Sequence, residues 1–281
     1  MKRNVIRRKA IESKSSADEA DVRDTGVQSV DRALSIIETL AEDDEGYRLS
    51  DLAIRTGLST STVHRLLGTL ESRRFVQFDR TESKWHVGAR AFTVGATFAR
   101  RRNFTAQAVP YLRKLRDLTR ETANLAVVDD EFIIVLTRME SREIMRSLTK
   151  VGGRVAMVAS GVGKAVLATY ADEDVNAIIR HHGMPRLTEK SIIRPSDLFK
   201  ELEKIRRQGF AVDDEEACMG LRCIAAVVYN DCAEPLAAIS VSGMTGRLTD
   251  ERLPQLGQTV REVAAELTIA LGGVMPAAKS L

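Results

Sequence analysis

The sequence predicts an α+β protein with an N-terminal winged helix-turn-helix, a linker helix and a larger C-terminal unit of helices packed on an antiparallel sheet. Its length of 281 residues is typical of about two domains. Apolar residues recur with helical spacing up to about residue 75, whereas short apolar runs joined by tight turns alternate with helical segments from residue 104 onwards. These two patterns predict one mostly helical unit followed by one mixed unit.

The composition excludes membrane-spanning and disulfide-rich proteins. The chain contains no run of 18 or more apolar residues, so we expect no membrane-spanning segment. Its three cysteines, Cys218, Cys223 and Cys232, form neither a disulfide framework nor a zinc-ligand pattern. This usage favours reduced thiols in a cytoplasmic protein, with no metal and no cofactor expected.

Residues 1–26 are charged and poor in large apolar side chains, which predicts a disordered basic arm. The arm lacks the apolar segment of a signal peptide. Its arginines and lysines either contact DNA or only keep the chain soluble, and the second reading is the simpler one. Residues 274–281 are expected to form a flexible tail.

The first ordered helix is expected over residues 27–42. Its apolar residues recur at helical spacing and end at an acidic turn, Asp43–Gly46. We expect the buried stripe to consist of Val30, Ala33, Leu34, Ile37, Leu40 and Ala41.

Residues 49–75 have the pattern of a helix-turn-helix. Ala53 is small enough for two helices to touch, Gly57 accepts the positive φ of a tight turn, and Val63 returns an apolar side chain to the crossing. Ser59 is placed to cap the second helix. The polar residues left on its other faces are able to bond phosphates or base edges, and we predict that they bind DNA: Ser59, Thr60, Ser61, Thr62, His64, Arg65 and Thr69. The alternative is an ordinary pair of helices with a polar outer face.

A β-hairpin is expected after this helix, because Val76 and Phe78, and then Trp85 and Val87, alternate with polar residues. Three helices and a two-stranded wing make a winged helix-turn-helix over residues 27–87. Arg80 and Lys84 near the tip of the wing are expected to contact the DNA backbone or a minor groove, unless they are plain surface charges.

The basic residues of the chain gather in this region. Ten lysines and arginines but only three acidic residues lie between residues 55 and 102, so this window carries +7 while the rest of the chain carries −4. A local basic surface on a nearly neutral protein suits contact with phosphate. Taken alone, the same cluster is equally compatible with a solvated face.

A linker helix is expected over residues 88–103, and its small apolar face suits packing against a second copy. Residues 104–273 are expected to form the second domain. Its predicted helices cover residues 109–122, 162–170, 172–180, 195–208 and 250–271, and its predicted strands cover residues 124–129, 132–137, 144–148, 210–212, 223–229 and 236–241.

The run Ala159–Ala165 contains a glycine turn that leads into a helix. It is not a phosphate-binding P-loop, because Val158 stands where the first glycine is required and Ala165 where Ser or Thr would bind magnesium. The turn either binds a small anion such as a carboxylate through helix N–H groups, or it needs its glycines only for close packing.

Ser240 and Ser242 alternate along one strand and therefore point to the same face of the sheet. Hydroxyl groups in a half-buried strand need partners, which are either a polar ligand or neighbouring protein groups. A nucleophilic Cys223 would need an activating base or cation, and its neighbourhood in sequence offers only Arg222. His181 and His182, at a helix end, are expected to be exposed.

Several blocks in the same order resemble the IclR family of bacterial transcriptional regulators. They are TGLSTSTVHRLLGTL, WHVGARAFTVGATF, VGGRVAMVASGVGKAVLA, GFAVDDEEACMGLRCIAA and AAISVSG. The resemblance as a whole covers residues 27 to 273, and the later blocks are most similar to members that control the glyoxylate bypass.

This resemblance implies a GAF-like second domain, homodimers or homotetramers on double-stranded palindromic promoter DNA, and control by a small organic acid similar to glyoxylate or pyruvate. It also implies that the acid lies between the glycine turn and the strands after the acidic run. The matching effector-binding positions are Ser147, Val155, Gly161, Val162, Asp213, Leu221, Cys223, Ser240 and Ser242. Ser147 replaces a large apolar residue, so an aromatic or sugar acid stays an alternative.

Two other functions remain open from sequence alone. The second domain could be an enzyme that uses Cys223 on small 2-oxo acids, although no base is visible near it. The chain could also be an architectural DNA-binding protein without a ligand, which an elaborate α+β domain argues against.

Overall fold

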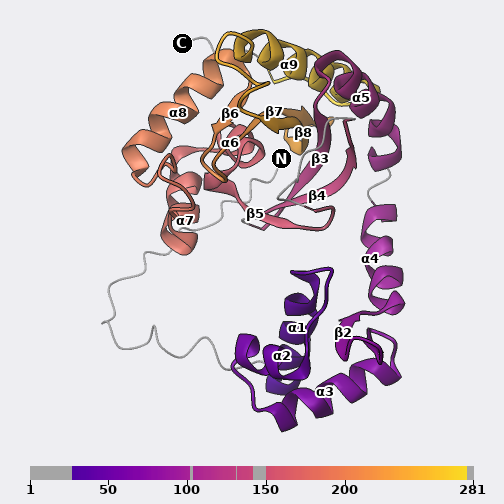
Figure 1. The fold of residues 1–281 in the computed structure, drawn as a ribbon. Coiled ribbons are helices and arrows are strands. Elements are labelled where there is room, and N and C mark those ends of the chain that lie inside the picture. The colour runs from indigo at the N-terminus through magenta and orange to yellow at the C-terminus, as the bar shows by residue number, and fades with distance from the viewer. Residues whose placement is uncertain (1–26, 102–103, 131, 142–149, 277–281) are drawn as a thin grey trace, which may run out of the picture. The chain divides into compact units, whose positions relative to one another are not determined.

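The computed structural model describes residues 27–101, 104–130, 132–141 and 150–276. The predicted basic arm and the last five residues of the predicted tail lie outside this part of the chain. The protein divides into two compact units, with the boundary between Phe98 and Ala99. Figure 1 shows the helical N-terminal unit in indigo and purple and the mixed C-terminal unit in magenta to yellow.

The N-terminal unit has the order of elements that the sequence predicts. Its two strands form an antiparallel hairpin in which Val76 lies opposite Val87 and Phe78 opposite Trp85. The elements are α1 (Gln28–Ala41), α2 (Leu49–Thr56), α3 (Thr60–Ser72), β1 (Val76–Asp79), β2 (Lys84–Val87) and α4 (Ala89–Arg101). The winged helix-turn-helix is therefore confirmed, and the boundary between the units falls within α4.

The turn between α2 and α3 forms for the expected physical reasons. Gly57 ends α2 with a φ of 65°, a left-handed conformation that favours glycine. Ala53 and Val63 are buried where the helices meet. The hydroxyl of Ser59 accepts a hydrogen bond from the backbone N–H of Thr62 at 3.3 Å and so caps α3.

The buried stripe of α1 differs from the prediction. Ile36 and Leu40 are buried, whereas Val30 is 54% exposed and Leu34 is 53% exposed. Ala41, also predicted to be buried, is exposed. Of the predicted stripe, Leu40 is buried and Ile37 packs partly buried on the core that α2, α3 and the wing share. Ile36, which was not predicted, is also buried in that core.

The C-terminal unit is a six-stranded antiparallel sheet with helices on both faces, which confirms the predicted class. The strand order is β5-β4-β3-β8-β7-β6. The strands are β3 (Thr122–Asp129), β4 (Phe132–Met139), β5 (Arg154–Ala156), β6 (Ala211–Asp214), β7 (Leu221–Tyr229) and β8 (Pro235–Met244). The helices are α5 (Phe104–Thr119), α6 (Gly161–Leu167), α7 (Asp172–His182), α8 (Pro195–Gln208) and α9 (Leu253–Ala270), and a short 3₁₀ turn, η1 (Met157–Ala159), precedes α6.

Two apolar layers stabilise this unit. One face of the sheet packs on α5 and α9, where Leu112, Leu115 and Val260 are buried against Leu125 and Ile239. The other face packs on α6, α7 and α8, where Val166, Val175 and Leu198 join strand residues. Figure 1 shows α5 and α9 together on one side of the strands and α6, α7 and α8 on the other.

Several elements of the second unit differ from the sequence-based prediction. The helix expected to reach residue 122 ends at Thr119, because Arg120 takes a φ of 63° and Thr122 already pairs with Ser242. The short strand β5 was not predicted. The strand expected over residues 144–148 lies outside the described residues.

Candidate functional site

The outer face of α3 carries the side chains predicted to contact DNA. Thr60, His64 and Arg65 are exposed, while Val63 and Leu67 on the opposite face are fully buried. The hydroxyls of Ser61 and Thr62 lie 3.1 and 2.8 Å from that of Ser59. The hydroxyl of Thr69, which is also exposed, donates to the carbonyl of Arg65 at 3.1 Å. The side chains of His64 and Arg65 take part in none of these local hydrogen bonds, so both are available to a partner in solution.

The two predicted wing residues have different surroundings. Arg80 is exposed in the turn between β1 and β2. Lys84 is only 25% exposed, and its ammonium group lies 3.3 Å from Glu82 and 3.9 Å from Glu45. The two acidic neighbours reduce the positive charge that Lys84 presents, so Arg80 is the stronger cation of the wing.

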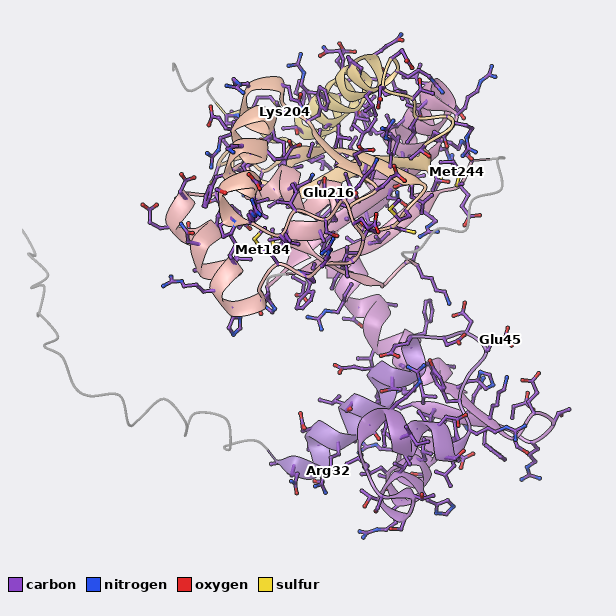
Figure 2. All side chains as sticks on the ribbon, turned by 60° about the vertical axis from the view of Figure 1, so that its left-hand side comes forward. Arg32, Glu45, Met184, Lys204, Glu216 and Met244 are labelled. Atoms are coloured by element: carbon purple, nitrogen blue, oxygen red, sulfur yellow. The ribbon has the colours of Figure 1, made fainter. Side chains whose placement is uncertain are left out.

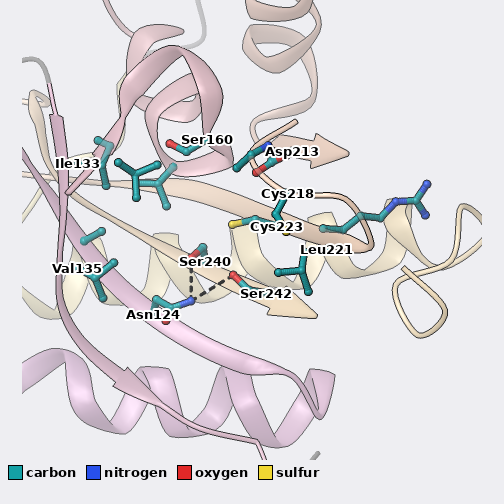
Figure 3. A pocket seen from close by; sticks show the side chains of 15 residues that line it. Asn124, Ile133, Val135, Ser160, Asp213, Cys218, Leu221, Cys223, Ser240 and Ser242 are labelled. Atoms are coloured by element: carbon teal, nitrogen blue, oxygen red, sulfur yellow. Dashed lines mark hydrogen bonds between the residues drawn. The ribbon is translucent and has the colours of Figure 1, made fainter. Parts of the chain in front are cut away.

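A pocket of about 110 Å³ lies between the sheet and the start of α6 (Figure 3). Its apolar wall comes mainly from β4, β5 and Val162 of α6, and its polar groups come mainly from Asn124 of β3 and from β6, β7 and β8. The lining residues are Asn124, Ala126, Ile133, Val135, Val155, Ser160, Val162, Asp213, Ala217, Cys218, Leu221, Arg222, Cys223, Ser240 and Ser242. Seven of the predicted effector residues are among them: Val155, Val162, Asp213, Leu221, Cys223, Ser240 and Ser242.

The strand register explains how distant residues meet in this pocket. Directly opposite residues of antiparallel strands point to the same face. One row across the sheet joins Asn124 to Ser240. The next row joins Ser242 to Cys223 and Cys223 to Asp213. The polar wall is therefore two adjacent rows of one sheet face.

Asn124 is a central residue of the polar wall that sequence reasoning missed. Its side-chain amide donates to the hydroxyls of Ser240 and Ser242, both at 3.4 Å (Figure 3). A protein group thus supplies one partner for each serine, and each hydroxyl keeps further bonding capacity toward the cavity. The alternation of β3 would have placed Asn124 on one face with Ala126, but its partners are more than a hundred residues away in sequence.

The glycines in the first turn of α6 serve close packing. A Cβ atom on Gly163 would lie 2.0 Å from the carbonyl oxygen of Met157, and one on Gly161 would lie 2.9 Å from that of Cys223. Gly161 therefore sits directly against the pocket strand β7. Ser160 lines the pocket and caps α6 by accepting the N–H of Gly163 at 3.0 Å. Packing accounts for both glycines, whether or not an anion binds beside them.

The lysine of the glycine turn is a buried structural cation. Lys164 is fully buried, donates to the carbonyl of Val212 at 2.7 Å and forms a very short ion pair with Glu216. Its ammonium also lies 3.9 Å from Glu201. In Figure 2 Glu216 lies inside the unit, while Lys204 lies on the outside of α8. This network joins α6 to β6 and α8 and explains why the lysine is not a phosphate ligand.

Asp213 places a buried carboxyl group at the polar end of the pocket. Its Oδ1 accepts the backbone N–H of Glu216 at 2.7 Å and that of Ala217 at 3.3 Å. Burial and the nearby Glu216 charge raise the pKa of Asp213 to about 6, against the opposing effect of Lys164. The carboxyl group therefore changes its charge near pH 6, well above the ordinary range of an aspartate.

Cys223 is not prepared for nucleophilic chemistry. Burial and the Asp213 charge raise the pKa of its thiol to about 11. A thiol held in its protonated form is a weak nucleophile. Cys223, Cys218 and Cys232 are all free cysteines.

Some predicted features lie elsewhere. Ser147, assigned to the effector site, lies outside the described residues. His182 packs edge-on against Phe132, with ring centres 5.0 Å apart, and against His181 at 4.7 Å, away from the residues that line the pocket. Within the described ranges, no group of three His, Cys, Asp or Glu side chains is arranged to hold a metal ion. In the same ranges, no helix is both long and apolar enough to span a bilayer.

Comparison with known proteins assigns both units to one family. The model of the IclR helix-turn-helix domain matches residues 29–80, and that of the bacterial transcriptional regulator IclR C-terminal domain matches residues 96–269. The chain is 40% identical over 249 residues to the acetate operon repressor of Salmonella typhimurium and 39% identical over 250 residues to the transcriptional repressor IclR of Escherichia coli. Each match covers 88% of this chain and 91% of the relative.

Solved structures agree in fold. A regulator from Alicyclobacillus acidocaldarius has a TM-score of 0.74 at 24% identity, covering 88% of this chain and 100% of that chain. An IclR homologue from Microbacterium hydrocarbonoxydans, complexed with 4-hydroxybenzoate, has a TM-score of 0.72 at 22% identity, covering 87% and 99%. With a winged helix-turn-helix, a helix-covered sheet and two matching family models, the chain belongs to the IclR family and is an IclR-type transcriptional repressor with a C-terminal effector-binding domain.

Proposed function

We propose that this repressor binds a palindromic promoter in the cytoplasm through α3 of paired copies, and that a small organic acid in the pocket controls its affinity for that DNA. The acid is of the glyoxylate or pyruvate kind. The observation that carries this proposal is the pocket itself, where a sheet face collects one amide, two hydroxyls and a carboxyl group beside an apolar wall.

The DNA contacts follow from the geometry of α3. Its polar face is exposed over its length, and a helix of this kind enters the major groove and reads base edges with its N-terminal residues. We assign Arg65 and His64 to base edges or phosphates and Arg80 of the wing to the backbone. Ser59, Thr60, Ser61, Thr62, Thr69 and Lys84 complete the proposed surface.

Pairing of copies is supported by apolar side chains that this chain leaves uncovered. Val27, Val30 and Leu34 form an exposed stripe on α1, and Phe92 on α4 is 79% exposed. Apolar faces of this kind are typical of association between copies. A homodimer places two copies of α3 in successive major grooves about one helical turn apart, which matches a palindromic site. A homotetramer would contain two such pairs.

Control by the acid requires that the acid binds one arrangement of the assembly better than another. A coupling free energy of about 1–3 kcal/mol would change promoter affinity by roughly 5- to 150-fold. α4, at the boundary between the units, is the proposed lever.

The test measures binding of the full-length chain to a duplex that it selects from a random pool, by fluorescence anisotropy. We expect glyoxylate or pyruvate to change the affinity by at least about fivefold. Ser240→Ala combined with Ser242→Ala should weaken this response and leave DNA binding without acid unchanged. Ser196→Ala, on the exposed side of α8, is the matched control. Unchanged affinity and oligomeric state with every acid would refute the sensing role.

A second candidate effector is an aromatic acid. The apolar wall formed by Ile133, Val135, Val155, Val162 and Leu221 suits a ring, and the relative complexed with 4-hydroxybenzoate shows that the fold accepts such a ligand in that protein. The same titration with 4-hydroxybenzoate distinguishes the two, since the more strongly coupled acid is the better effector class.

A further inference from the structure

In the part of the chain that the structure describes, three cations lie in or beside the pocket, and two of them are neutralised within the protein. Lys164 is paired with Glu216. Arg222 donates to Asp214 at 2.5 Å, to Asp250 at 2.6 Å and to the carbonyl of Leu248 at 2.6 Å. Neither has charge to spare for a ligand, so a negatively charged effector needs another counter-ion.

Arg138 is the third cation, and the register of the sheet places it beside the pocket. On β4 it lies directly opposite Asn124, which in turn lies opposite Ser240. Directly opposite residues point to the same face and have Cα atoms about 5 Å apart. Arg138 therefore extends the row of Asn124 and Ser240 beyond the edge of the cavity.

The guanidinium group of Arg138 is buried without adequate partners. Its side chain is only 13% exposed, and its Nε and Nη2 atoms have no hydrogen-bond partner among the described residues. Among the described residues, Glu140 lies 4.0 Å from Nη1, and its side chain is 75% exposed. A buried guanidinium with unused N–H groups costs stability unless an anion binds it, and its planar fork matches a carboxylate.

We propose that Arg138 binds a second carboxylate of the effector, so that the pocket prefers a small dicarboxylic acid to the monocarboxylic acid of the same skeleton. This inference rests on the proposed effector role of the pocket and specifies its ligand class. One carboxylate lies in the cavity near the two serines, and the second lies next to Asn124 and Arg138. The aliphatic part of the acid lies on Ala126 and Val135.

The test is isothermal titration calorimetry of the full-length chain with two matched pairs of acids. Succinate is propionate with a second carboxylate on its methyl group, and malate is lactate with the same addition. We expect each dicarboxylate to bind about tenfold more tightly than its partner, or more. Arg138→Met should bring succinate and malate to the level of propionate and lactate, and leave those two within about twofold of the wild type.

Arg154→Met is the matched control, because Arg154 is an exposed cation on the neighbouring strand β5 and stacks on Phe132. Arg154 precedes pocket-lining Val155 and so points to the opposite face of the sheet. This variant should keep the full preference for dicarboxylates. Arg138→Lys retains the charge without the fork and should keep a reduced preference, which tests the proposal even where the Met variant folds poorly.

Three results would overturn the proposal. Equal binding of both members of each pair to the wild type would show that Arg138 recognises no second carboxylate. Affinities for both members that fall together in the Arg138→Lys variant would show a structural role only. Binding of neither member of either pair would overturn this inference as well. The titration with glyoxylate and pyruvate then decides whether the effector role of the pocket also fails, so the two failures are distinguished.

Discussion

The two units place their polar functional groups in opposite surroundings. In the N-terminal unit, His64 and Arg65 lie on one helix and face solvent. In the C-terminal unit, Asn124 and Ser240 are buried and are separated by 116 residues in sequence. Water satisfies the hydrogen bonds of the exposed α3 side chains until DNA replaces it. The buried pocket side chains instead need hydrogen-bond partners from other strands of the folded protein.

This difference determines what a substitution costs. Removing an exposed cation leaves no other charge unsolvated, so its effect appears only when a partner binds. Removing a buried one leaves its counter-ion without compensation in a region of low dielectric. The same chemical change should therefore affect DNA binding in one unit and folding in the other.

Lys164→Met gives the largest expected effect on stability. It leaves the buried carboxylate of Glu216 without its cation, and we expect a loss of about 3–5 kcal/mol in the free energy of unfolding of the C-terminal unit. Urea unfolding followed by far-UV circular dichroism measures the loss. Lys204→Met, on the exposed side of α8, should change stability by less than about 1 kcal/mol. Equal stabilities of the two variants would contradict the comparison.

Arg65→Ala is the corresponding change in the DNA-binding unit. We expect operator binding to weaken by about 1–3 kcal/mol, because a side chain at the DNA surface is lost, while unfolding is unchanged. Anisotropy with the selected duplex measures the first quantity. Fluorescence of Trp85, the single tryptophan of the chain, reports unfolding of this unit. Arg32→Ala on α1 controls for the loss of one positive charge. If Arg32→Ala weakened operator binding as much as Arg65→Ala does, the assignment of Arg65 to the DNA surface would be refuted.

The buried carboxyl group of Asp213 predicts a pH-dependent pocket. Its pKa of about 6 is raised mainly by burial. Above that pH the ionised group repels an acid effector, so affinity for pyruvate should fall, by up to about tenfold for each pH unit. The charged and titratable groups around it are Glu216 in the turn that follows β6, Lys164 on α6 and Cys223 on β7.

Calorimetry with pyruvate between pH 5 and 8 measures this dependence. Asp213→Asn should bind pyruvate with little dependence on pH across that range. The same raised pKa makes the folding contribution of Asp213 fully present below its ordinary value and lost as the pH rises through about 6. A wild-type affinity that is constant from pH 5 to 8 would show that no effector carboxylate lies near Asp213.

A pair of glycines sharpens the comparison at the smallest scale. Gly57→Ala should destabilise the N-terminal unit by about 1 kcal/mol, because alanine is strained at its positive φ. Gly68→Ala, inside α3 with open space around it, should stabilise the unit by about 0.5–1 kcal/mol. Trp85 fluorescence during thermal unfolding measures both. If both substitutions changed the stability of the unit in the same direction, the positive φ of the turn would not explain why glycine occupies position 57.

Much of the fold follows from local patterns. The bounds of α8 were predicted to the residue, and those of α2, α3 and the wing follow from Ala53, Gly57, Ser59 and the alternation of apolar residues. The buried face of α1 was predicted only in part: Leu40 is buried as expected, but Val30 and Leu34 are exposed and Ile36 is buried instead. The apolar residues of α1 spread over more than one face, and only packing against α2 and α3 selects those that are buried. The edge strand β5 has three residues, too few for a periodic signal.

The candidate pocket was predicted in part. The alternation of Ser240 and Ser242 indicated a shared face, but Asn124 and Arg138 give no local signal of their position. Each lies in a mostly apolar strand, and the sequence of that strand alone does not show which residue of another strand its polar side chain meets. Only the pairing of β3 with β4 and β8 brings the amide, the hydroxyls and the guanidinium into one row.

Neighbouring residues alone were enough to specify the DNA-reading helix, since a turn conformation, a cap and a helical period act over a few residues. The three-dimensional fold alone assigned Lys164 to a structural ion pair, Arg138 to the pocket row and Asp213 to a titration near neutral pH. The reason is that burial and charge compensation depend on which groups surround a side chain in space, and in an antiparallel sheet those groups come from strands far apart along the chain.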